Sequence, residues 1–431
     1  MSNEDELDVI VVGAGPAGLA CAFEVASKGL EVAVLERGDV AGAKNLSGGR
    51  LYLGPLRELC GNLLKDAPFE RRVVSESIVM CDEDSSLSFR VHTGSGDERA
   101  ESVTVLRAKL DEFLADKASE AGALVMGQQP GGELVREDGR IAGVMVGEEE
   151  LRASVVVAAD GALSFLAEEV GIRKERVPHS YGVGVKEIIE IKSDIINDRF
   201  NVSADQGEAR LFIGRITRGL PGGGFIYTNK GSLSIGIVVQ MSALQKWKSE
   251  EKLWELLERF KERSDVAPLI AGGKTVEYGA HLIPEGGVDD MPPLGIPGLL
   301  FCGDAAGLVL NTGATLRGMD LALASGTIAG RSIVAAREAD MDPAACLKTY
   351  EQALAESFVM KEMQSHRKAP ALLALERLYD HYPKETVRVA KKFFEVGKEG
   401  ESMSIGQAMK KMRRDVLGWR GLKDLWRLYR T

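Results

Sequence analysis

The sequence lacks the cysteine patterns that bind metals and the long apolar runs that cross membranes. Its five cysteines stand far apart, with no Cys-x-x-Cys pair and no histidine at metal-ligand spacing, so we expect no zinc or iron–sulfur site in the chain. No run reaches the roughly 18 apolar residues of a membrane-spanning helix, because Asp304 and Arg331 interrupt the best candidates. Scattered thiols and the absence of a cleavable leader favour reduced cysteines in a cytoplasmic protein.

The chain also lacks an excess of positive charge. Its 54 Lys and Arg stand against 64 Asp and Glu, which argues against nucleic-acid binding because phosphate neutralisation needs clustered cations. Residues 401–431 differ, with eight Lys or Arg against three Asp or Glu, a net charge of +5 against −15 for the remainder. Apolar side chains recur there at helical spacing, at Trp419, Leu422, Leu425, Trp426 and Tyr429. This pattern predicts an amphipathic helix for an anionic membrane surface, for an acidic partner, or for packing on its own domain.

A glycine-rich turn stands at the start of the chain. Residues 8–12 form an apolar run, residues 16–28 are helical in pattern, and glycines occupy the first, third and sixth places of residues 13–18. In this spacing the first glycine permits a tight turn, the second lets backbone approach a pyrophosphate, and the third lets the helix pack on the strand. Glu36 ends the next apolar run, where its carboxylate can bind both ribose hydroxyls. We interpret this as a nucleotide-binding βαβ unit; the alternative is an ordinary tight strand-to-helix turn.

A second polar feature follows a later apolar run. Gly303 and Asp304 come directly after residues 299–302. A carboxylate at this strand end could accept hydrogen bonds from the ribityl hydroxyls of a flavin, and Gly303 would allow close approach; the alternative for Asp304 is a helix N-cap. Residues 311–315 precede an expected helix over 316–336, whose positive N-terminal end suits a reduced flavin. The combination predicts FAD.

The length of 431 residues predicts two or three structural units. Hydrophobic periodicity indicates strands and helices between the motifs. We expect short antiparallel strands within 72–105, a helix from 106 to about 121, a hairpin at 133–146, a buried strand at 153–159, a second sheet within 181–240, a helix over 244–263, a strand at 275–283 and helices after 343.

These residues resemble the electron-transfer flavoprotein:quinone oxidoreductase family, and within it the short FixC-type subunits, over nearly the whole chain. The specific blocks are 42–49 and 313–320, supported by 13–18, 278–287 and 303–304. The resemblance implies an α/β fold with a glutathione-reductase-like FAD-binding Rossmann domain, an inserted mixed β-sheet domain for quinone and a C-terminal helical region. The implied division is 1–72, 101–165 and 290–340 for the FAD domain, 73–100 and 166–289 for the sheet domain, and 341–431 for the helical region.

The expected FAD contacts lie at strand ends and in the glycine-rich loop. They are Gly13, Ala14, Gly15, Pro16, Ala17, Gly18, Glu36, Arg37, Lys44, Asn45, Ser47, Gly48, Gly49, Arg107, Asp160, Gly161, Gly303, Asp304, Gly313, Ala314 and Thr315. Arg107 matches a family arginine that reaches the FAD phosphates, the alternative being a solvated arginine at a helix start. Lys44 is expected beside the flavin ring or, alternatively, on the surface. Chemistry at flavin N5 needs no catalytic side chain, and we expect the five histidines to be structural or exposed.

A quinone pocket should border the flavin, because flat rings need close backbone approach. The candidates are Gly222, Gly223, Gly224, Phe225, Tyr278 and Gly279. The alternative for the glycine run is a hairpin beside a core aromatic.

Two departures from related flavoproteins narrow the function. Asp160 and Ser164 match part of a hydroxylase pattern, but Leu166 stands where that pattern has the arginine that handles NADPH. The chain also lacks the cluster-ligating cysteines of the longer quinone oxidoreductases. The resemblance therefore implies a flavoenzyme that passes electrons from an electron-transfer flavoprotein (α and β subunits) to quinone. It would work with a separate, FixX-like ferredoxin-like subunit, with possible contact to the inner face of the cell membrane through 401–431.

Two other functions stay open on the sequence. The chain could be a docking and electron-relay subunit without its own quinone site. It could also be a flavin-dependent lipid reductase of the geranylgeranyl type, although the Tyr-x-Trp-x-Phe-Pro signature of that group is absent.

Overall fold

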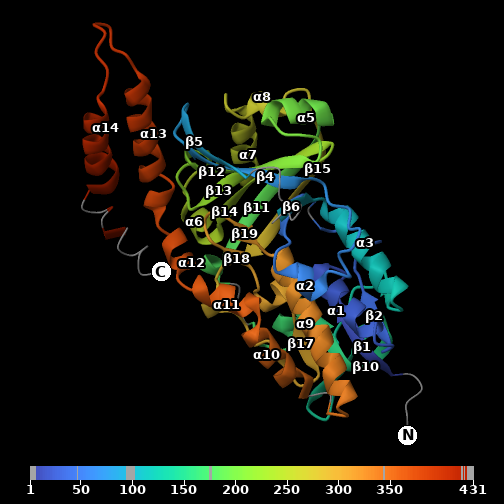
Figure 1. Ribbon diagram of the computed structural model, residues 1–431. Coiled ribbons are helices and arrows are strands. Elements are labelled where there is room, and N and C mark those ends of the chain that lie inside the picture. The colour runs from blue at the N-terminus through green and yellow to red at the C-terminus, as the bar shows by residue number, and fades with distance from the viewer. Residues whose placement is uncertain are drawn as a thin grey trace.

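The computed structural model describes residues 6–45, 47–93, 102–173, 177–342, 345–418, 421, 423 and 424. Two β-sheets organise these residues, and a group of helices formed by the last part of the chain extends along one side of the molecule (Figure 1). The larger hydrophobic cluster surrounds the first sheet, and a smaller one lies between the second sheet and its helices.

The first sheet is built around parallel strands. Its order among the described residues is β16-β17-β10-β1-β2-β7, with β9 and β8 continuing from β10. The bounds are β1 Leu7–Val12, β2 Val32–Leu35, β7 Leu124–Met126, β8 Leu134–Glu137, β9 Arg140–Val146, β10 Glu149–Ala158, β16 Gly295–Ile296 and β17 Leu299–Phe301. Strands β2, β1, β10 and β17 are parallel neighbours, so their carboxyl ends meet at one edge, where parallel α/β sheets bind ligands.

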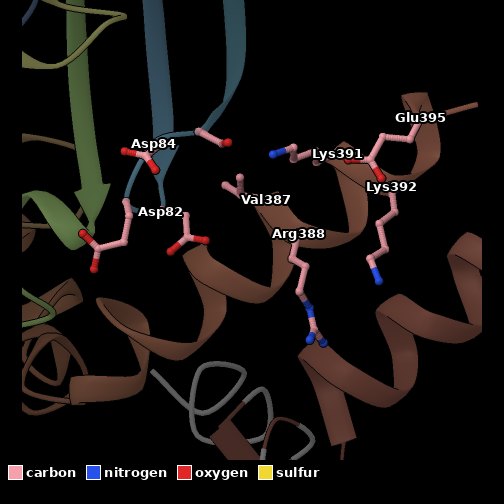
Figure 2. Close-up of a pocket in the computed structure, with 9 residues that line it drawn as sticks. Asp82, Asp84, Val387, Arg388, Lys391, Lys392 and Glu395 are labelled. Carbon is pink, nitrogen blue, oxygen red and sulfur yellow. The ribbon is translucent and has the colours of Figure 1, made fainter.

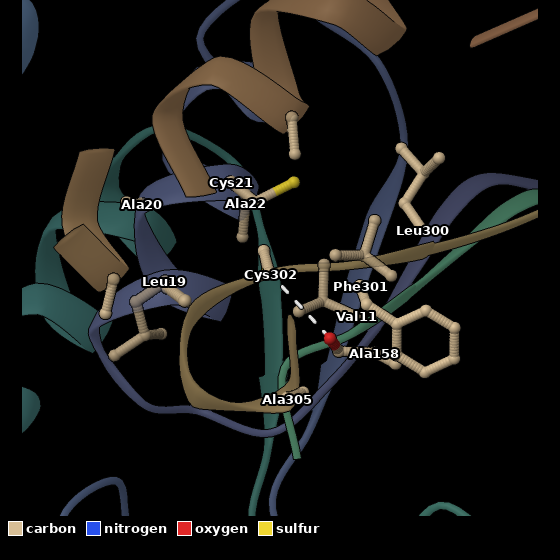
Figure 3. Packing of buried hydrophobic residues seen from close by; sticks show 14 of the residues in the cluster. Val11, Leu19, Ala20, Cys21, Ala22, Ala158, Leu300, Phe301, Cys302 and Ala305 are labelled. Carbon is tan, nitrogen blue, oxygen red and sulfur yellow. Dashed lines mark hydrogen bonds between the residues drawn. The ribbon is translucent and has the colours of Figure 1, made fainter. Parts of the chain in front are cut away.

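Helices cover this sheet, and two of them, α1 and α9, touch through their backbones. They are α1 Pro16–Ala26, α2 Leu56–Cys60, α3 Arg107–Glu120, α4 Phe165–Glu169 and α9 Met319–Glu338. A Cβ atom on Gly326 of α9 would lie 1.9 Å from the carbonyl oxygen of Ala17 in α1, so these two helices pack as closely as their backbones allow. Leu19 and Cys21 of α1 pack beside Cys302 in the same buried cluster (Figure 3). All five cysteines are buried and none forms a disulfide.

The second sheet is mixed. Its order in the described part of the chain is β15-β11-β14-β13-β12-β4-β6-β3, with β5 paired to β4. The bounds are β3 Gly49–Tyr52, β4 Arg72–Cys81, β5 Ser86–His92, β6 Ser102–Val105, β11 Tyr181–Glu190, β12 Gln206–Gly214, β13 Gly222–Thr228, β14 Ser232–Gln240 and β15 Lys274–Pro284. Helices α5 Ser193–Phe200, α7 Leu253–Glu262 and α8 Ala267–Ile270 cover one face (Figure 1). Phe260 of α7 meets Phe212 of β12 there, with ring centroids 4.8 Å apart.

The remaining elements connect the sheets and form the C-terminal region. They are η1 Pro178–Ser180, η2 Arg215–Thr217, α6 Met241–Lys246, η3 Val288–Asp290, η4 Gly303–Ala306, β18 Leu310–Asn311, β19 Leu316–Arg317, α10 Cys346–Glu356, α11 Phe358–Ser365, α12 Ala369–Leu373, η6 Glu376–Leu378, α13 His381–Phe394, α14 Ile405–Lys411 and the π-helical η7 Met412–Leu417. Helices α13 and α14 lie side by side and project from the body (Figure 1). None of the described helices is long and apolar enough to cross a membrane.

The structure confirms the βαβ unit, the hairpin, the buried strand at 153–159 and the C-terminal helices. It corrects two helices. The expected helix over 244–263 is wrong, because α6 ends at Lys246 and Lys252 begins α7 with Glu255 accepting from its backbone N–H. The expected helix start at Leu316 is also wrong, because residues 316–317 pair with residues 310–311 as a short ribbon. Strands β3 and β6 join the second sheet although they fall inside the ranges expected for the FAD domain.

Candidate functional site

The glycine turn between β1 and α1 leaves room on one side only. Gly13 has a φ of +107°, and a Cβ atom on it would lie 2.4 Å from the carbonyl oxygen of Ala159. A Cβ atom on Gly18 would lie 2.1 Å from the carbonyl oxygen of Gly13. A Cβ atom on Gly15, by contrast, would meet nothing nearer than the Arg107 guanidinium at 3.9 Å. The turn is therefore closed toward the sheet and open above Gly15, beside a cation.

Glu36 follows β2 and lies against the same turn. One carboxylate oxygen accepts the backbone N–H of Ala14 at 3.0 Å, and the other accepts that of Gly38 at 2.7 Å. Both bonds hold the carboxylate at the carboxyl edge of the sheet. This placement is the one that the sequence predicts for a ribose-binding acid.

Arg107 begins α3 and is held in a fixed orientation. Its guanidinium donates twice to Asp111, at 2.8 and 2.7 Å. Asn45 donates to the same carboxylate at 2.5 Å, so the loop at 42–45 and the arginine share one anchor. Burial acts to lower the pKa of Arg107, but Asp111 raises it overall, and the guanidinium stays charged.

Asp304 and Asp160 stand at neighbouring strand ends. Asp304 follows β17 within η4, and burial raises its pKa while His281 and Arg107 oppose that rise. Burial also raises the pKa of Asp160, whose Oδ2 accepts the backbone N–H of Leu166 at 3.1 Å. The other oxygen of Asp160 is buried and has no hydrogen-bond partner among the described residues. The edge thus holds two half-buried carboxyl groups, and one oxygen of Asp160 has unused capacity for a hydrogen bond.

The loop at 42–49 ties the first sheet to the second. The backbone N–H of Ser47 donates to Glu277 of β15 at 2.6 Å, and Lys186 of β11 donates to the carbonyl oxygen of Gly48. A Cβ atom on Gly48 would lie 2.1 Å from the Ser234 hydroxyl of β14, so the loop backbone rests directly on this sheet. Lys44 is exposed, the position that the sequence left as its alternative. Leu46, inside the loop, lies outside the described residues.

The face of the second sheet that meets this loop is rich in glycine. Strand register places Lys186 opposite Gly236 on one side and Gly279 on the other, and places Phe225 opposite Gly236. A Cβ atom on Gly236 would lie 2.5 Å from Cβ of Lys186 and 2.6 Å from the Phe225 ring. Phe225 stacks on Tyr227 with centroids 4.9 Å apart.

The structure divides the six expected quinone contacts between the two faces. Gly223, Phe225 and Gly279 share the face of Lys186 by strand alternation. Gly224 belongs to the opposite face, because a Cβ atom there would lie 3.1 Å from the Phe260 ring of α7. Tyr278 alternates with Gly279 and is 55% exposed. At Gly222, a Cβ atom would meet the Val238 carbonyl oxygen at 2.2 Å.

Positive groups gather where the two sheets meet. Burial and the nearby Arg107 lower the pKa of Lys186 to about 7, with Glu277 opposing. Desolvation by the surrounding protein lowers the pKa of His281. The charges of Arg107, Lys186 and Arg37 lower it further, and Asp304 opposes them. Lys186, Glu277 and His281 are the site residues that the sequence did not reveal. The available signal was a lysine at residue 186 inside an apolar strand pattern.

A second loop closes the site from the C-terminal side. Gly313 has a φ of +84°, and its N–H donates to the Asn311 side chain at 2.9 Å. Asn311 donates in turn to Glu285, at the end of β15, at 2.9 Å. Burial raises the pKa of Glu285 to about 7, while the Asn311 hydrogen bond opposes that rise. Glu285 thus anchors residues 311–315 to the second sheet, and Ala314 is exposed on that loop.

The hollow in Figure 2 lies away from the strand ends of the first sheet and from the 42–49 loop. It measures about 320 Å³ and lies between the turn that joins β4 to β5 and helix α13. Asp82 and Asp84 line one side, and Arg388, Lys391 and Lys392 line the other. None of the expected site residues lines it. We place the site at the strand ends, where the motifs and the buried charges coincide.

Comparisons with known proteins bear on this site. A family model described as "FAD dependent oxidoreductase" matches residues 8–172, and one described as "ETF-QO, ubiquinone-binding" matches residues 181–283. The probable electron transfer flavoprotein-quinone oxidoreductase YdiS of Escherichia coli K12 is 41% identical over 95% of this chain and 96% of its own. The protein FixC of the same strain is 40% identical over 96% of this chain and 95% of its own.

A solved structure shows the same fold. It is a geranylgeranyl bacteriochlorophyll reductase-like protein from Thermoplasma acidophilum, with a TM-score of 0.73 and 23% identity over 98% of this chain and 99% of that one. At this identity the likeness concerns the fold alone.

We expect Glu285→Gln to stabilise the protein at alkaline pH. Because the pKa of Glu285 is raised from 4.5 to about 7 in the folded chain, the folded state retains a proton that the unfolded state releases, and stability falls as pH rises between those values. Glutamine carries no such proton and can still accept from Asn311. The variant should be about 1–3 kcal/mol more stable than the parent near pH 8 and equal to it near pH 4.5.

Thermal unfolding across this pH range measures the effect. Glu149→Gln, at an exposed glutamate on β10, is the matched control and should leave the pH dependence unchanged. A constant difference between Glu285→Gln and the parent at all pH values would contradict the argument.

Proposed function

Because the chain belongs to the family of FixC proteins and electron transfer flavoprotein-quinone oxidoreductases, we propose that it passes electrons from an electron-transfer flavoprotein to a quinone. It is a FAD-dependent oxidoreductase with a quinone-binding domain. In the proposal it is the quinone-reducing subunit of a complex that also contains a small ferredoxin-like iron–sulfur protein. The observation that carries the proposal is the loop at 42–49, which joins the strand ends of the first sheet to the glycine-rich face of the second.

The residues at the strand ends fit FAD. The open space above Gly15, with Arg107 behind it, suits a pyrophosphate, and Glu36 suits the adenosine ribose. The buried, unused oxygen of Asp160 and the carboxyl group of Asp304 suit hydroxyl donors of the cofactor. Bound FAD would supply reversible uptake of two electrons at its ring system. We propose that the contacts expected from the sequence hold it, and that the exposed side chain of Lys44 folds inward to do so.

Arg107→Met tests the cofactor assignment. Loss of a charged donor to phosphate costs about 1.5–3 kcal/mol, so we expect the dissociation constant of FAD to rise about tenfold to 100-fold. Equilibrium dialysis or quenching of flavin fluorescence measures it. Lys109→Met, on the same helix and paired with Glu70, is the matched control and should bind FAD like the parent. Equal affinity in Arg107→Met and Lys109→Met would contradict the role of Arg107.

The proposed reaction is tested on the FAD-loaded chain. The flavin is reduced with one equivalent of dithionite under argon and then mixed with a water-soluble menaquinone analogue, while flavin absorbance is followed. We expect the oxidised spectrum to return. A parallel mixture adds an electron-transfer flavoprotein and a ferredoxin-like protein. If the quinone fails to reoxidise the flavin in both mixtures, the proposal is wrong and a relay role or a lipid reductase takes its place.

We also propose that the protein is peripheral on an anionic membrane. The α13–α14 projection carries Phe394, Ile405 and Met409, which are 80%, 69% and 69% exposed, beside basic side chains at 391, 392, 410 and 411. Apolar side chains among cations are typical of helices that lie in the membrane interface. Much of the amphipathic tail, residues 419, 420, 422 and 425–431, lies outside the described residues. Asp424 of the tail is buried and pairs with Arg377 at 2.7 Å, so at least this residue packs on the chain itself.

Sedimentation with lipid vesicles tests this location. We expect the chain to bind vesicles containing phosphatidylglycerol, to bind phosphatidylcholine vesicles weakly, and to be released by salt. Phe394→Ser combined with Ile405→Ser should reduce the bound fraction several-fold. Phe165→Ser, at a 56% exposed side chain on α4, is the matched control. Binding that is unaffected by the paired substitutions would rule out the α13–α14 projection as the contact.

A further inference from the structure

Lys186 lies on a face of the second sheet where both of its cross-strand neighbours are glycines. Its neighbours across the strands are Gly236 on β14 and Gly279 on β15. Gly184 precedes it by two residues on the same face of β11, and Gly223 lies on that face of β13, two residues before Phe225. Gly236 and Gly279 leave the surface directly beside the lysine bare, and Val238, opposite both Gly184 and Gly223, borders it together with the Phe225–Tyr227 stack. A flat ring resting on the glycines would lie beside the amine.

The amine of Lys186 is held toward the loop at 42–49. It donates to the carbonyl oxygen of Gly48, which belongs to the loop that we expect to contact the flavin ring. The charged groups facing it are Arg107 of α3 and Glu277 of β15, together with His281 of β15. His281 in turn faces Asp304 of η4 and Arg37. Burial and the neighbouring Arg107 both disfavour the charged form of the Lys186 amine, and Glu277 offsets them only in part.

We propose that Lys186 is the catalytic residue that donates a proton to a quinone oxygen during quinone reduction, an inference that rests on the proposed function. Conversion of a quinone to a quinol requires two electrons and two protons. A hydride equivalent from the reduced cofactor accounts for both electrons and one proton. The Lys186 ammonium supplies the second proton, an O–H bond forms as an N–H bond breaks, and the lysine is left as a neutral amine.

The environment suits this role. An ordinary lysine, with a pKa of 10.5, holds its proton too tightly to give it up near neutral pH, whereas Lys186 has a pKa of about 7. General acids work best when the pKa lies near the operating pH, and such donors typically contribute about 10²–10⁴-fold in rate. Glycine at 236 also matters, because a Cβ atom there would lie 2.5 Å from Cβ of Lys186 and would displace this side chain.

The experiment compares two electron acceptors on the FAD-loaded, reduced chain. The menaquinone analogue takes up protons, and the ferricenium ion takes one electron and no proton. We expect Lys186→Met to slow oxidation by the quinone about 100-fold and to leave oxidation by ferricenium within about twofold of the parent. Lys186→Arg retains the charge but holds its proton above about pH 12, so it should be as slow as Lys186→Met with quinone. Lys274→Met, at an exposed lysine on β15, is the matched control.

The pH profile separates proton donation from a structural role. In the parent, oxidation by quinone should slow about tenfold per unit once pH exceeds the pKa of the ammonium, because the neutral amine has no proton to give. The bend should lie at or above about 7, since bound FAD adds negative phosphate charge nearby. Lys186→Met should show no such bend.

Lysine reactivity in the parent chain can be measured without turnover, so it tests the inference even if a variant folds poorly. Reductive methylation of the parent chain at a series of pH values, read by mass spectrometry, reports the protonation of each lysine. We expect Lys186 to become fully methylated at a lower pH than Lys274, both with and without FAD.

Three results would overturn the inference. They are equal slowing with both acceptors, full activity of Lys186→Arg with quinone, or a reactivity profile of Lys186 that matches that of Lys274. Failure of the parent chain to react with quinone is a different result, and it contradicts the proposed function instead.

Discussion

Backbone contact at the start of α1 is the constraint on which the rest of the structure depends. Three backbones meet there without space for a Cβ atom, because Gly13 lies against Ala159, Gly18 against Gly13, and Gly326 against Ala17. Gly303 is close as well, since a Cβ atom on it would lie 2.9 Å from that of Ala17. These contacts bring the end of β10, η4 and α9 to one turn, although Ala159, Gly303 and Gly326 follow it by about 140, 290 and 310 residues in the sequence. Asp304 reaches the glycine turn for this reason, and the two halves of the proposed cofactor site come together.

Local sequence signals are sufficient to predict structure where a motif and its strand are contiguous in the chain. The glycine spacing at 13–18 and the acid at Glu36 predict the first unit because strand, turn and helix follow one another within about 25 residues. The helix over 244–263 failed for the opposite reason. Its apolar periodicity continues across Trp247, but a new helix starts after Lys252, whose backbone N–H donates to the Glu255 carboxylate. Lysine is not among the residue types that signal an N-cap, so the sequence gives little warning of this start.

The remaining part of the site depends on strand register, which no single stretch of sequence encodes. Lys186 becomes central because β14 and β15 place glycines on both sides of it, and a shift of one residue would turn it toward α7. The same alternation separates Gly223 from Gly224, two neighbours that the sequence treats alike. Glu277 and His281 reach the site through β15, at the edge of the sheet. Such residues become visible only when the pairing of distant strands is known.

The proposed cofactor side and the proposed substrate side of the site form one electrostatic unit. Arg107 belongs to the cofactor side, where Asp111 fixes it, yet it is the charge that does most, after burial, to lower the pKa of Lys186 on the sheet. His281 links the two, since Asp304 attracts its proton while Arg107 and Lys186 repel it. An anionic ligand beside Arg107 relieves this repulsion and favours the protonated forms of both residues. The protonation of Lys186 therefore depends on what lies beside Arg107, because this one guanidinium faces both the glycine turn and the second sheet.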